Sequence, residues 1–329
     1  MRLATVNRNG DARLCTAHDG VWVDVTDFVR SIIGTGADDN MIGLIRKGPA
    51  ALDSLRGALA TGNAASFQRI DIDQVSWLPP VTAPSKIVCI ALNNRALDAV
   101  KLRAPTDHPA FFVKTQTALV GHEQPINLRR SFGLTHPEPE LAVIIGRRIK
   151  DASPDEALAA VFGYTIMNDV TSVGMREEDS FTFRYFRPDP GGGEPIASEG
   201  HTTYPGRYKG SDGFAPLGPC IVTRDEIADP DNLDIRCWLG DQLVASDNTR
   251  NYVWSVANAL SHVSRTMTLL PGDVVSMGTA VGGDLDDADQ PAIPGITKAN
   301  LVDHQGSVSV EVAGLGRLSN PVSTSDGPY

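Results

Sequence analysis

The sequence predicts a mostly-β chain of the α+β class, made of a small N-terminal α+β domain (residues 1–83) and a larger domain (residues 84–329). Short β-branched segments bounded by turn residues outnumber the helical patterns. Strands and helices do not alternate regularly, which argues against a doubly wound parallel sheet. A proline-rich stretch at 71–85, DIDQVSWLPPVTAPS, separates the two parts and marks the boundary.

The N-terminal part reads as an accessory domain with few chemically reactive groups. Residues 1–30 alternate apolar and polar side chains around two turn signals, Asn9-Gly10 and Asp19-Gly20, which predict short strands joined by tight hairpins. Residues 38–62 carry a stripe of Ile and Leu and are predicted to be helical.

The larger domain is predicted to be rich in strands. Two helices interrupt them, at 153–161 and 250–266, and the first begins with Ser153-Pro154-Asp155-Glu156, a helix-start pattern. The predicted strands are KIVCIAL (86–92), PAFFVKT (109–115), ELAVIIG (140–146), FGYTIM (162–167), PCIVT (219–223), LDIRCWL (233–239), DVVSM (273–277) and VSVEV (308–312).

Residues 179–213 differ from the rest of this domain. They hold four aromatic residues within the first eight positions and then a Gly/Pro-rich middle. Aromatic residues do not suit a solvated tether, so we interpret the segment as a long excursion or lid. A surface loop is the alternative.

The composition excludes several classes of function. Lys and Arg number 29 against 40 Asp and Glu, a net charge of −11, which gives no electrostatic reason to bind nucleic acid or an anionic membrane. No apolar stretch is long enough to cross a bilayer, and the first residues lack a signal-peptide pattern. Four scattered cysteines form no CxxC motif, so we expect a cytoplasmic protein.

The strongest local signal for chemistry is His136-Pro137-Glu138-Pro139-Glu140, directly before an apolar strand. Side chains alternate along a strand, so His136, Glu138 and Glu140 are predicted to share a face. Two carboxylates that close repel each other unless a cation or a proton lies between them. Oxygen ligands favour Mg²⁺, Mn²⁺ or Ca²⁺ over zinc. The alternative is a charged strand end.

Two weaker signals follow. Asp169 ends the next apolar strand and is a candidate third carboxylate, although such residues commonly end strands in turns. The turn Pro271-Gly272-Asp273 leads into a strand that ends at Gly278-Thr279, where backbone N–H groups are candidates to bind a substrate carboxylate. An ordinary turn is the alternative at each.

Taken together, these motifs resemble those of the fumarylacetoacetate hydrolase family. The resemblance runs from Lys86 to about Asn320 and includes KIVCIALNNR (family form KIVCVGLNYR), EPELAVIIGR, VFGYTIMNDVT, RYKGSDGFAPLGP and TLLPGDVVSMGT. It implies a β-roll catalytic domain, a homodimer, and a divalent metal, Mg²⁺ or Mn²⁺. Residues 1–83 are similar to the small N-terminal domain of longer members.

The resemblance also implies roles for individual residues. The three metal carboxylates fall on Glu138, Glu140 and Asp169, with Lys209 as the lysine near the metal. The predicted substrate-binding residues are Arg95, Lys114, Tyr164, Gly278 and Thr279.

The sequence departs from the family pattern at the acid/base pair. Many members carry a His and, three residues later, a Glu, where this chain has Leu97 and Val100. Neither side chain can move a proton. We therefore expect the 179–208 segment to bring replacements, Glu199 and His201; His136 is an alternative base or fourth ligand.

The predicted function is metal-dependent cleavage of a C–C bond in an acylpyruvate or β-diketone-type carboxylic acid through an enolate, by hydrolysis. The alternatives on the same scaffold are a 2-oxo acid decarboxylase, a hydratase or an isomerase, which differ in whether a general base must activate water. A catalytically silent protein that binds a metal and a small ligand is a third reading. The missing acid/base pair motivates it, and the three retained carboxylates argue against it.

Overall fold

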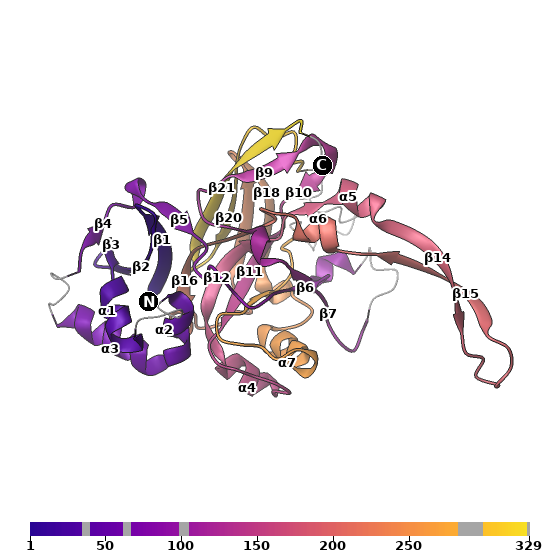
Figure 1. The fold of residues 1–329 in the computed structure, drawn as a ribbon, viewed down its shortest axis with the longest axis horizontal. Coiled ribbons are helices and arrows are strands. Elements are labelled where there is room, and N and C mark those ends of the chain that lie inside the picture. Colours follow the sequence, from indigo (N-terminus) through magenta and orange to yellow (C-terminus); the bar gives the residue numbers. More distant parts are fainter. Residues whose placement is uncertain (35–39, 62–66, 99–104, 282–298, 328–329) are drawn as a thin grey trace.

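The structure is a computed structural model, and it describes residues 1–34, 40–61, 67–98, 105–281 and 299–327. The N-terminal strands and helices form one end of the molecule, two sheets form its middle, and a long hairpin extends from the opposite side (Figure 1). Within these ranges, no helix combines the length and the apolar character that a membrane crossing requires.

The largest sheet runs through both parts of the chain in the order β4-β3-β2-β1-β16-β12-β11-β19-β6-β7, with β5 on β1 and β8 on β16. Every strand predicted for the larger domain forms. The strands of this sheet are β1 (Arg2–Arg8), β2 (Asp11–His18), β3 (Val21–Asp24), β4 (Arg69–Ile70), β5 (Ser76–Leu78), β6 (Ile87–Ala91), β7 (Ala110–Lys114), β8 (Leu119–Val120), β11 (Pro139–Ile145), β12 (Val161–Asn168), β16 (Ala215–Thr223) and β19 (Val274–Ser276).

A second sheet of five strands has the order β18-β17-β20-β21-β9, and two strand pairs complete the β structure. The five strands are β9 (Ile126–Arg129), β17 (Asp234–Leu239), β18 (Gln242–Asn248), β20 (Gly306–Val312) and β21 (Gly316–Ser325). The pairs are β10 (Thr135–His136) with β13 (Thr171–Ser172), and β14 (Ser180–Arg187) with β15 (Ile196–Thr203).

Seven α-helices are found in the described ranges. They are α1 (Thr26–Ile33), α2 (Met41–Lys47), α3 (Pro49–Ala60), α4 (Pro154–Ala159), α5 (Val173–Glu178), α6 (Gly206–Gly210) and α7 (Val256–Thr266). The segment predicted to be helical at 38–62 contains two helices, because Gly48 has a φ of +72° and Pro49 begins the next helix. Helices α1, α5 and α6 were not predicted from the sequence.

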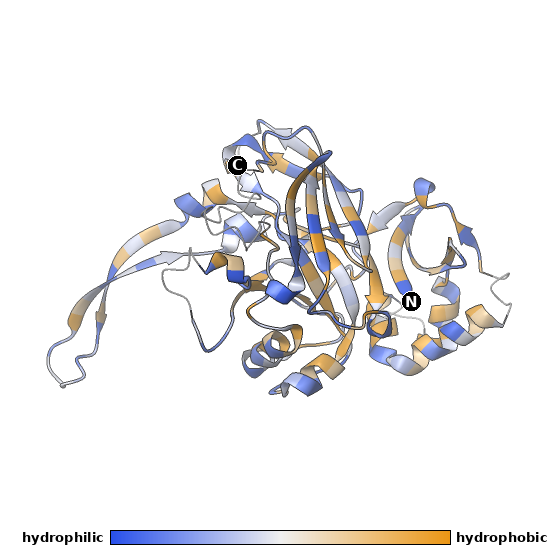
Figure 2. Cartoon of the chain, turned by 180° about the vertical axis from the view of Figure 1, so that it is seen from behind, coloured by the Kyte–Doolittle hydropathy of each residue, from blue (hydrophilic) through white to orange (hydrophobic). Residues whose placement is uncertain are grey.

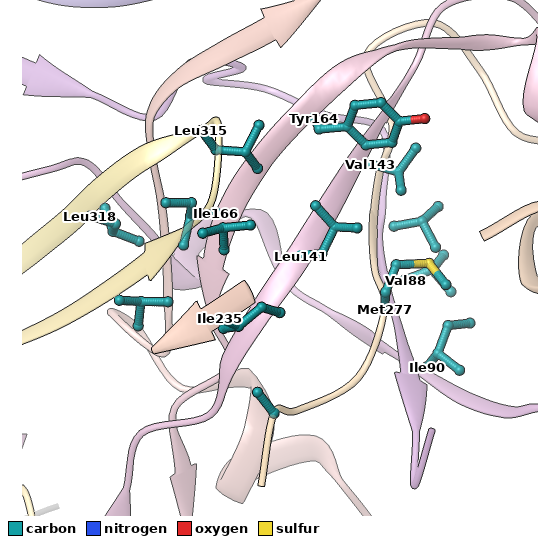
Figure 3. Close-up of a cluster of buried hydrophobic side chains, with 14 of the residues drawn as sticks. Val88, Ile90, Leu141, Val143, Tyr164, Ile166, Ile235, Met277, Leu315 and Leu318 are labelled. Atoms are coloured by element: carbon teal, nitrogen blue, oxygen red, sulfur yellow. The ribbon is translucent and has the colours of Figure 1, made fainter. Parts of the chain in front are cut away.

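The core explains why β11 reads as a continuous apolar run. Its alternate residues face two different buried clusters, Leu141 and Val143 one, Ala142 and Ile144 the other. The first cluster lies between the two sheets, where Leu141 and Ile166 lie near Ile235 of the second sheet (Figure 3). Both faces of β11 are therefore shielded from solvent.

The second cluster joins the two parts of the chain. Leu3 and Leu14 of the N-terminal strands belong to it together with Ile87 and Phe162 of the larger part. Strand β1 also pairs with β16, so one sheet crosses the predicted boundary. The division at residue 83 stays a prediction, and the two parts share both a sheet and a core.

The 179–208 segment folds as a regular hairpin of β14 and β15, paired along its whole length from Ser180↔Thr203 to Arg187↔Ile196. It reaches away from the body of the chain (Figure 1). Both strands of the hairpin carry hydrophobic residues, although the hairpin extends into solvent (Figure 2). The structure therefore differs from the predicted lid, because the hairpin points away from the rest of the chain.

His122 links the two parts of the chain and makes stability depend on pH. Its ring packs edge-on to Trp77 with centroids 5.3 Å apart, and its Nδ1 accepts a hydrogen bond from the backbone N–H of Ser319 at 3.0 Å. Burial lowers the pKa of His122 below its ordinary value of 6.5, although the carboxylate of Glu123 opposes this. The neutral ring is therefore the form that the folded chain prefers.

We expect this contribution to stability to be complete above pH 6.5 and to be lost as the pH falls through the lower pKa of the folded state. His122→Gln keeps an acceptor for Ser319 without titrating. Its melting temperature should therefore fall less than that of the parent chain between pH about 7.5 and about 5. His201→Gln, on the exposed hairpin, is the control, and equal falls in all three proteins would contradict the prediction.

Candidate metal centre

The ends of two neighbouring strands bring three carboxylates together. Pro139 of β11 pairs with Asn168 of β12, so Glu140 and Asp169 lie at the same end of the sheet. The side chain of Asn168 accepts a hydrogen bond from the N–H of Glu138 at 2.9 Å, and the N–H of Asp169 donates to the carbonyl of Glu138 at 2.8 Å. One carboxylate oxygen from each of Glu138, Glu140 and Asp169 lies within 4.8 Å of the others.

The site is at the edge of the buried cluster that the two parts of the chain share. Glu140 continues the face of Ala142 and Ile144, and its Cα partner across the strands is Met167. These three apolar residues belong to the shared cluster. Apolar side chains therefore lie directly beside the carboxylates, and a charge there is poorly solvated.

Two buried lysines compensate part of the negative charge. Lys209 Nζ lies 2.6 Å from Glu138 Oε2 and 2.7 Å from Asp169 Oδ2, and Lys114 Nζ lies 2.6 Å from Asp169 Oδ1. Burial alone would raise the pKa of Asp169, but Lys114 and Lys209 hold it below its ordinary value. Burial alone would lower the pKa of Lys209, but Asp169 and Glu138 raise it.

Glu140 is the carboxylate that the lysines do not neutralise. Burial, followed by the charges of Asp169 and Glu138, raises its pKa well above the ordinary value. The hydroxyl of Ser276 and the N–H of Gly278 both donate to Glu140 Oε2, the latter at 3.0 Å. With all three acids ionised, the site carries one more negative charge than the two lysine ammonium groups balance.

This donor set fits a divalent cation. It offers three hard carboxylate oxygens, which are the ligands that Mg²⁺ and Mn²⁺ prefer. A divalent cation would also supply the missing positive charge and relieve the repulsion that Glu140 experiences. The chain thus has an acidic triad that can hold a divalent metal, as the sequence predicted.

The lysines are held in place by further contacts. Lys209 belongs to α6 and lies 4.9 Å from the ring centroid of Phe112, a cation–π distance. Lys114, at the end of β7, donates to the carbonyls of Phe214 at 2.5 Å and Val170 at 3.3 Å. Lys114 was predicted to bind substrate, and the structure instead places it against Asp169.

The other predicted substrate-binding residues have different surroundings. Arg95 is exposed, at the start of a 3₁₀ helix, and Thr279 is half-buried. The N–H of Gly278 is occupied by Glu140, so it supports a metal carboxylate. Tyr164 is 3% exposed inside the first core cluster near Val143 (Figure 3), and burial raises its pKa to about 12. Its predicted contact with substrate is corrected, because a ring buried there is not accessible.

The structure separates the candidates for proton transfer. Leu97 is buried, and Val100 lies outside the described residues. Glu199 lies 4.0 Å from Arg184 and His201 Nδ1 lies 3.3 Å from Thr182 Oγ1, all on the outward-reaching hairpin. The structure therefore does not bring Glu199 or His201 to the metal carboxylates.

His136 is the imidazole beside the triad. It is buried, and its Nε2 lies 3.9 Å from Glu138 Oε1. Its Nδ1 lies 3.2 Å from the carbonyl of Pro137, which can only accept, so this contact favours a proton on Nδ1. Nε2 faces the carboxylate of Glu138.

Sequence reasoning missed Ser276 and the supporting role of Asn168. Ser276 of β19 pairs with Ala142 of β11. Ala142 is two residues after Glu140 and lies on the same face of β11, so the hydroxyl of Ser276 reaches the carboxylate of Glu140. The signal was present in the segment Val275-Ser276-Met277-Gly278, where a polar residue interrupts an apolar strand two positions before the glycine.

We expect Glu140→Gln to abolish the rise in melting temperature that Mn²⁺ produces, because an amide replaces a charged ligand of the same size. For the parent chain, a ligand at about 100 times its Kd stabilises the fold by about 2.7 kcal/mol. Thermal unfolding with and without Mn²⁺ measures the effect. Glu123→Gln, an exposed change, is the matched control, and an unchanged Mn²⁺ response in Glu140→Gln would exclude the proposed ligand.

Comparisons with known proteins agree with the motifs and the fold. The family model described as fumarylacetoacetate (FAA) hydrolase C-terminal matches residues 86–323. The mitochondrial oxaloacetate tautomerase Fahd2a of Rattus norvegicus is 32% identical over 243 residues, which are 74% of this chain and 69% of that protein.

Two solved structures share the fold over nearly the whole chain. One is maleylpyruvate hydrolase from Sphingobium sp. SYK-6, in complex with manganese(II) and pyruvate, with a TM-score of 0.72, 27% identity, and coverage of 98% of this chain and 99% of that one. The other is a fumarylacetoacetate hydrolase from Exiguobacterium antarcticum, with a TM-score of 0.72, 28% identity, and coverage of 99% and 100%. The chain belongs to the fumarylacetoacetate hydrolase family of enzymes.

Proposed function

We propose that this enzyme cleaves the C–C bond of an acylpyruvate or related β-diketone acid by hydrolysis, with a divalent cation held by Glu138, Glu140 and Asp169. The observation that carries the proposal is the carboxylate triad, two of whose members are buried, with His136 Nε2 3.9 Å from the third, Glu138. When bound, the cation supplies Lewis-acid polarisation of the oxygens of a 2-oxo acid. The manganese(II) and pyruvate complex of the maleylpyruvate hydrolase supports this choice of substrate class.

His136 is the proposed proton carrier. Its Nδ1 is oriented by the carbonyl of Pro137, and its Nε2 is free to take a proton from water or from carbon. Lys209 and Lys114 keep Asp169 ionised, and Ser276 and Gly278 orient Glu140. The exposed Arg95 is proposed to bind the carboxylate of the substrate.

A second candidate is keto–enol tautomerisation of a 2-oxo acid. Leu97 occupies the place of the usual histidine, and an isomerase needs no activated water, so the missing pair favours this reading. The rat relative is named an oxaloacetate tautomerase. Decarboxylation and hydration use the same site and remain alternatives.

The decisive experiment is turnover against a panel of acylpyruvates, oxaloacetate and dienoates, with and without Mn²⁺ or Mg²⁺. We expect metal-dependent cleavage of an acylpyruvate. Interconversion of oxaloacetate tautomers without any cleavage would select the second candidate. No turnover of any compound would contradict both.

On the substrate that the panel identifies, His136→Gln should reduce the rate by roughly 10²–10⁴-fold, the usual contribution of a general acid or base. Its Mn²⁺-dependent thermal shift should persist, because the three carboxylates are intact. Glu199→Gln and His201→Ala, on the hairpin, should keep near-normal rates. A large loss in either hairpin variant with a normal His136→Gln rate would instead assign proton transfer to the hairpin.

We also propose a homodimer in which the hairpin packs against a second copy. Phe181, Phe183 and Tyr185 form a row on one face of β14, each 40–47% exposed, with neighbouring ring centroids 6.1 and 5.7 Å apart. A two-stranded hairpin is marginal in water unless its apolar face is covered. Strand β14 also carries two arginines and no acid, which complements a chain of net charge −11.

The proposed compartment is the cytoplasm, since all four cysteines are buried free thiols.

Sedimentation of the parent chain should give twice 35.1 kDa. Changing Phe183 and Tyr185 together to Ser should shift the protein to the single-chain mass, because the covered apolar area is lost. Arg184→Ser, on the opposite face of the hairpin, is the control. A parent chain that sediments only as a monomer would contradict the dimer, and a dimeric double variant would contradict the role of the hairpin.

A further inference from the structure

Three segments far apart in the sequence meet beside the metal centre. They are the turn after β6 that carries Arg95, the end of β18 with the 3₁₀ helix that follows, and the stretch after β19 that carries Gly278 and Thr279. Gly278 touches the metal centre directly through Glu140, at 3.0 Å. The turn that carries Arg95 is thereby connected to the metal centre through its neighbours.

The first turn is held in an unfavourable backbone conformation. Leu92 has a φ of +54°, which a side chain of this size rarely adopts, and it is exposed, so its own packing does not hold it. The amide of the next residue, Asn93, holds the turn. It donates to the carbonyls of Met277 at 2.7 Å and Trp254 at 3.0 Å, and it accepts from the N–H of Trp254 at 2.7 Å.

Asn94 ties the turn to both other segments. Its Nδ2 donates to Asp247 Oδ2 at 2.8 Å and lies 3.2 Å from the carbonyl of Thr279, and its Oδ1 accepts from the N–H of Ala96 at 2.9 Å. The last bond begins the 3₁₀ helix on which Arg95 stands. In the family form of this motif the residue is Tyr, which has no amide to make these bonds.

Asp247 receives hydrogen bonds from all three segments. Its Oδ2 accepts from Asn94 Nδ2 at 2.8 Å and from the N–H of Val281 at 3.1 Å. Its Oδ1 accepts from the N–H of Asn248 at 2.7 Å and from Asn251 Nδ2 at 2.6 Å. All four partners are N–H donors, which suits an ionised carboxylate and no other side chain of this size.

We propose that Asp247 is a positioning residue that fixes the Arg95 turn against the Gly278–Thr279 segment and so determines the affinity for the carboxylate of the substrate. The inference rests on the proposed function, in which Arg95 binds that carboxylate. Asp247 is not a member of the carboxylate triad. It acts by ordering the backbone from which the binding groups project, which reduces the entropy that binding must otherwise overcome.

Asp247→Asn is the sharpest test, because it keeps the size of the side chain and replaces one acceptor by a donor. Whichever oxygen position becomes NH₂ then faces another N–H group. The matched control is Asp234→Asn on β17, which accepts from Asn248 Nδ2 at 2.7 Å but contacts neither the Arg95 turn nor Val281. Arg95→Ala is measured in parallel.

For Asp247→Asn we expect KM to rise about tenfold with kcat nearly unchanged, the pattern of a lost binding interaction. Amide hydrogen exchange in residues 92–97 and 277–281 should become faster than in Asp234→Asn. The Mn²⁺-dependent thermal shift should stay that of the parent chain. If Asp247→Asn does not fold, Asn94→Ala breaks the same bond from the other side and takes its place.

The outcomes separate the inference from the function on which it rests. A rise in KM for Arg95→Ala together with an unchanged KM for Asp247→Asn would overturn the role of Asp247. Unchanged hydrogen exchange would overturn it as well, whatever the kinetics. An Arg95→Ala variant with normal KM would instead show that the proposed carboxylate recognition is wrong.

Discussion

The candidate metal site depends on how three carboxylates are kept together in an apolar environment. Glu138, Glu140 and Asp169 lie within 4.8 Å of one another at the edge of a buried cluster, where unpaired charge is costly. Lys114 and Lys209 neutralise two of the three charges. The negative charge that remains suits a divalent cation.

The supporting elements can be understood from this constraint. Strand β7 ends at Lys114 and the short helix α6 delivers Lys209, so both cations come from the ends of elements near the carboxylates. Ser276 and Gly278 orient Glu140 from β19 and the stretch that follows it. Residues of the N-terminal strands belong to the same core cluster as the apolar residues next to Glu140, so this part of the chain helps to support the candidate metal site.

Two further features lie outside the carboxylate triad: the hairpin, and the hydrogen bonds that Asp247 makes to the Arg95 turn. The hairpin adds a long, partly aromatic arm between Asp169 and Lys209 without disturbing either, because its two strands leave and return side by side. In the Arg95 turn, Asn94 is found where the family form has Tyr, and its amide donates a hydrogen bond to the carboxylate of Asp247. With both features present, the carboxylate triad and its two lysines remain in contact.

The sequence by itself determined the strands, the three carboxylates and Lys209. Period-two alternation before an apolar run puts Glu138 and Glu140 at a strand end, and the family motifs identified Asp169 and Lys209. Only the tertiary structure decided the partners of these groups. Local patterns cannot show that Lys114 turns to Asp169, that Tyr164 packs in the core, or that the 179–208 segment reaches outward, because each depends on contacts between residues far apart in the chain. Asp247 was missed for the same reason, since its partners span nearly two hundred positions and meet only when the strands pair.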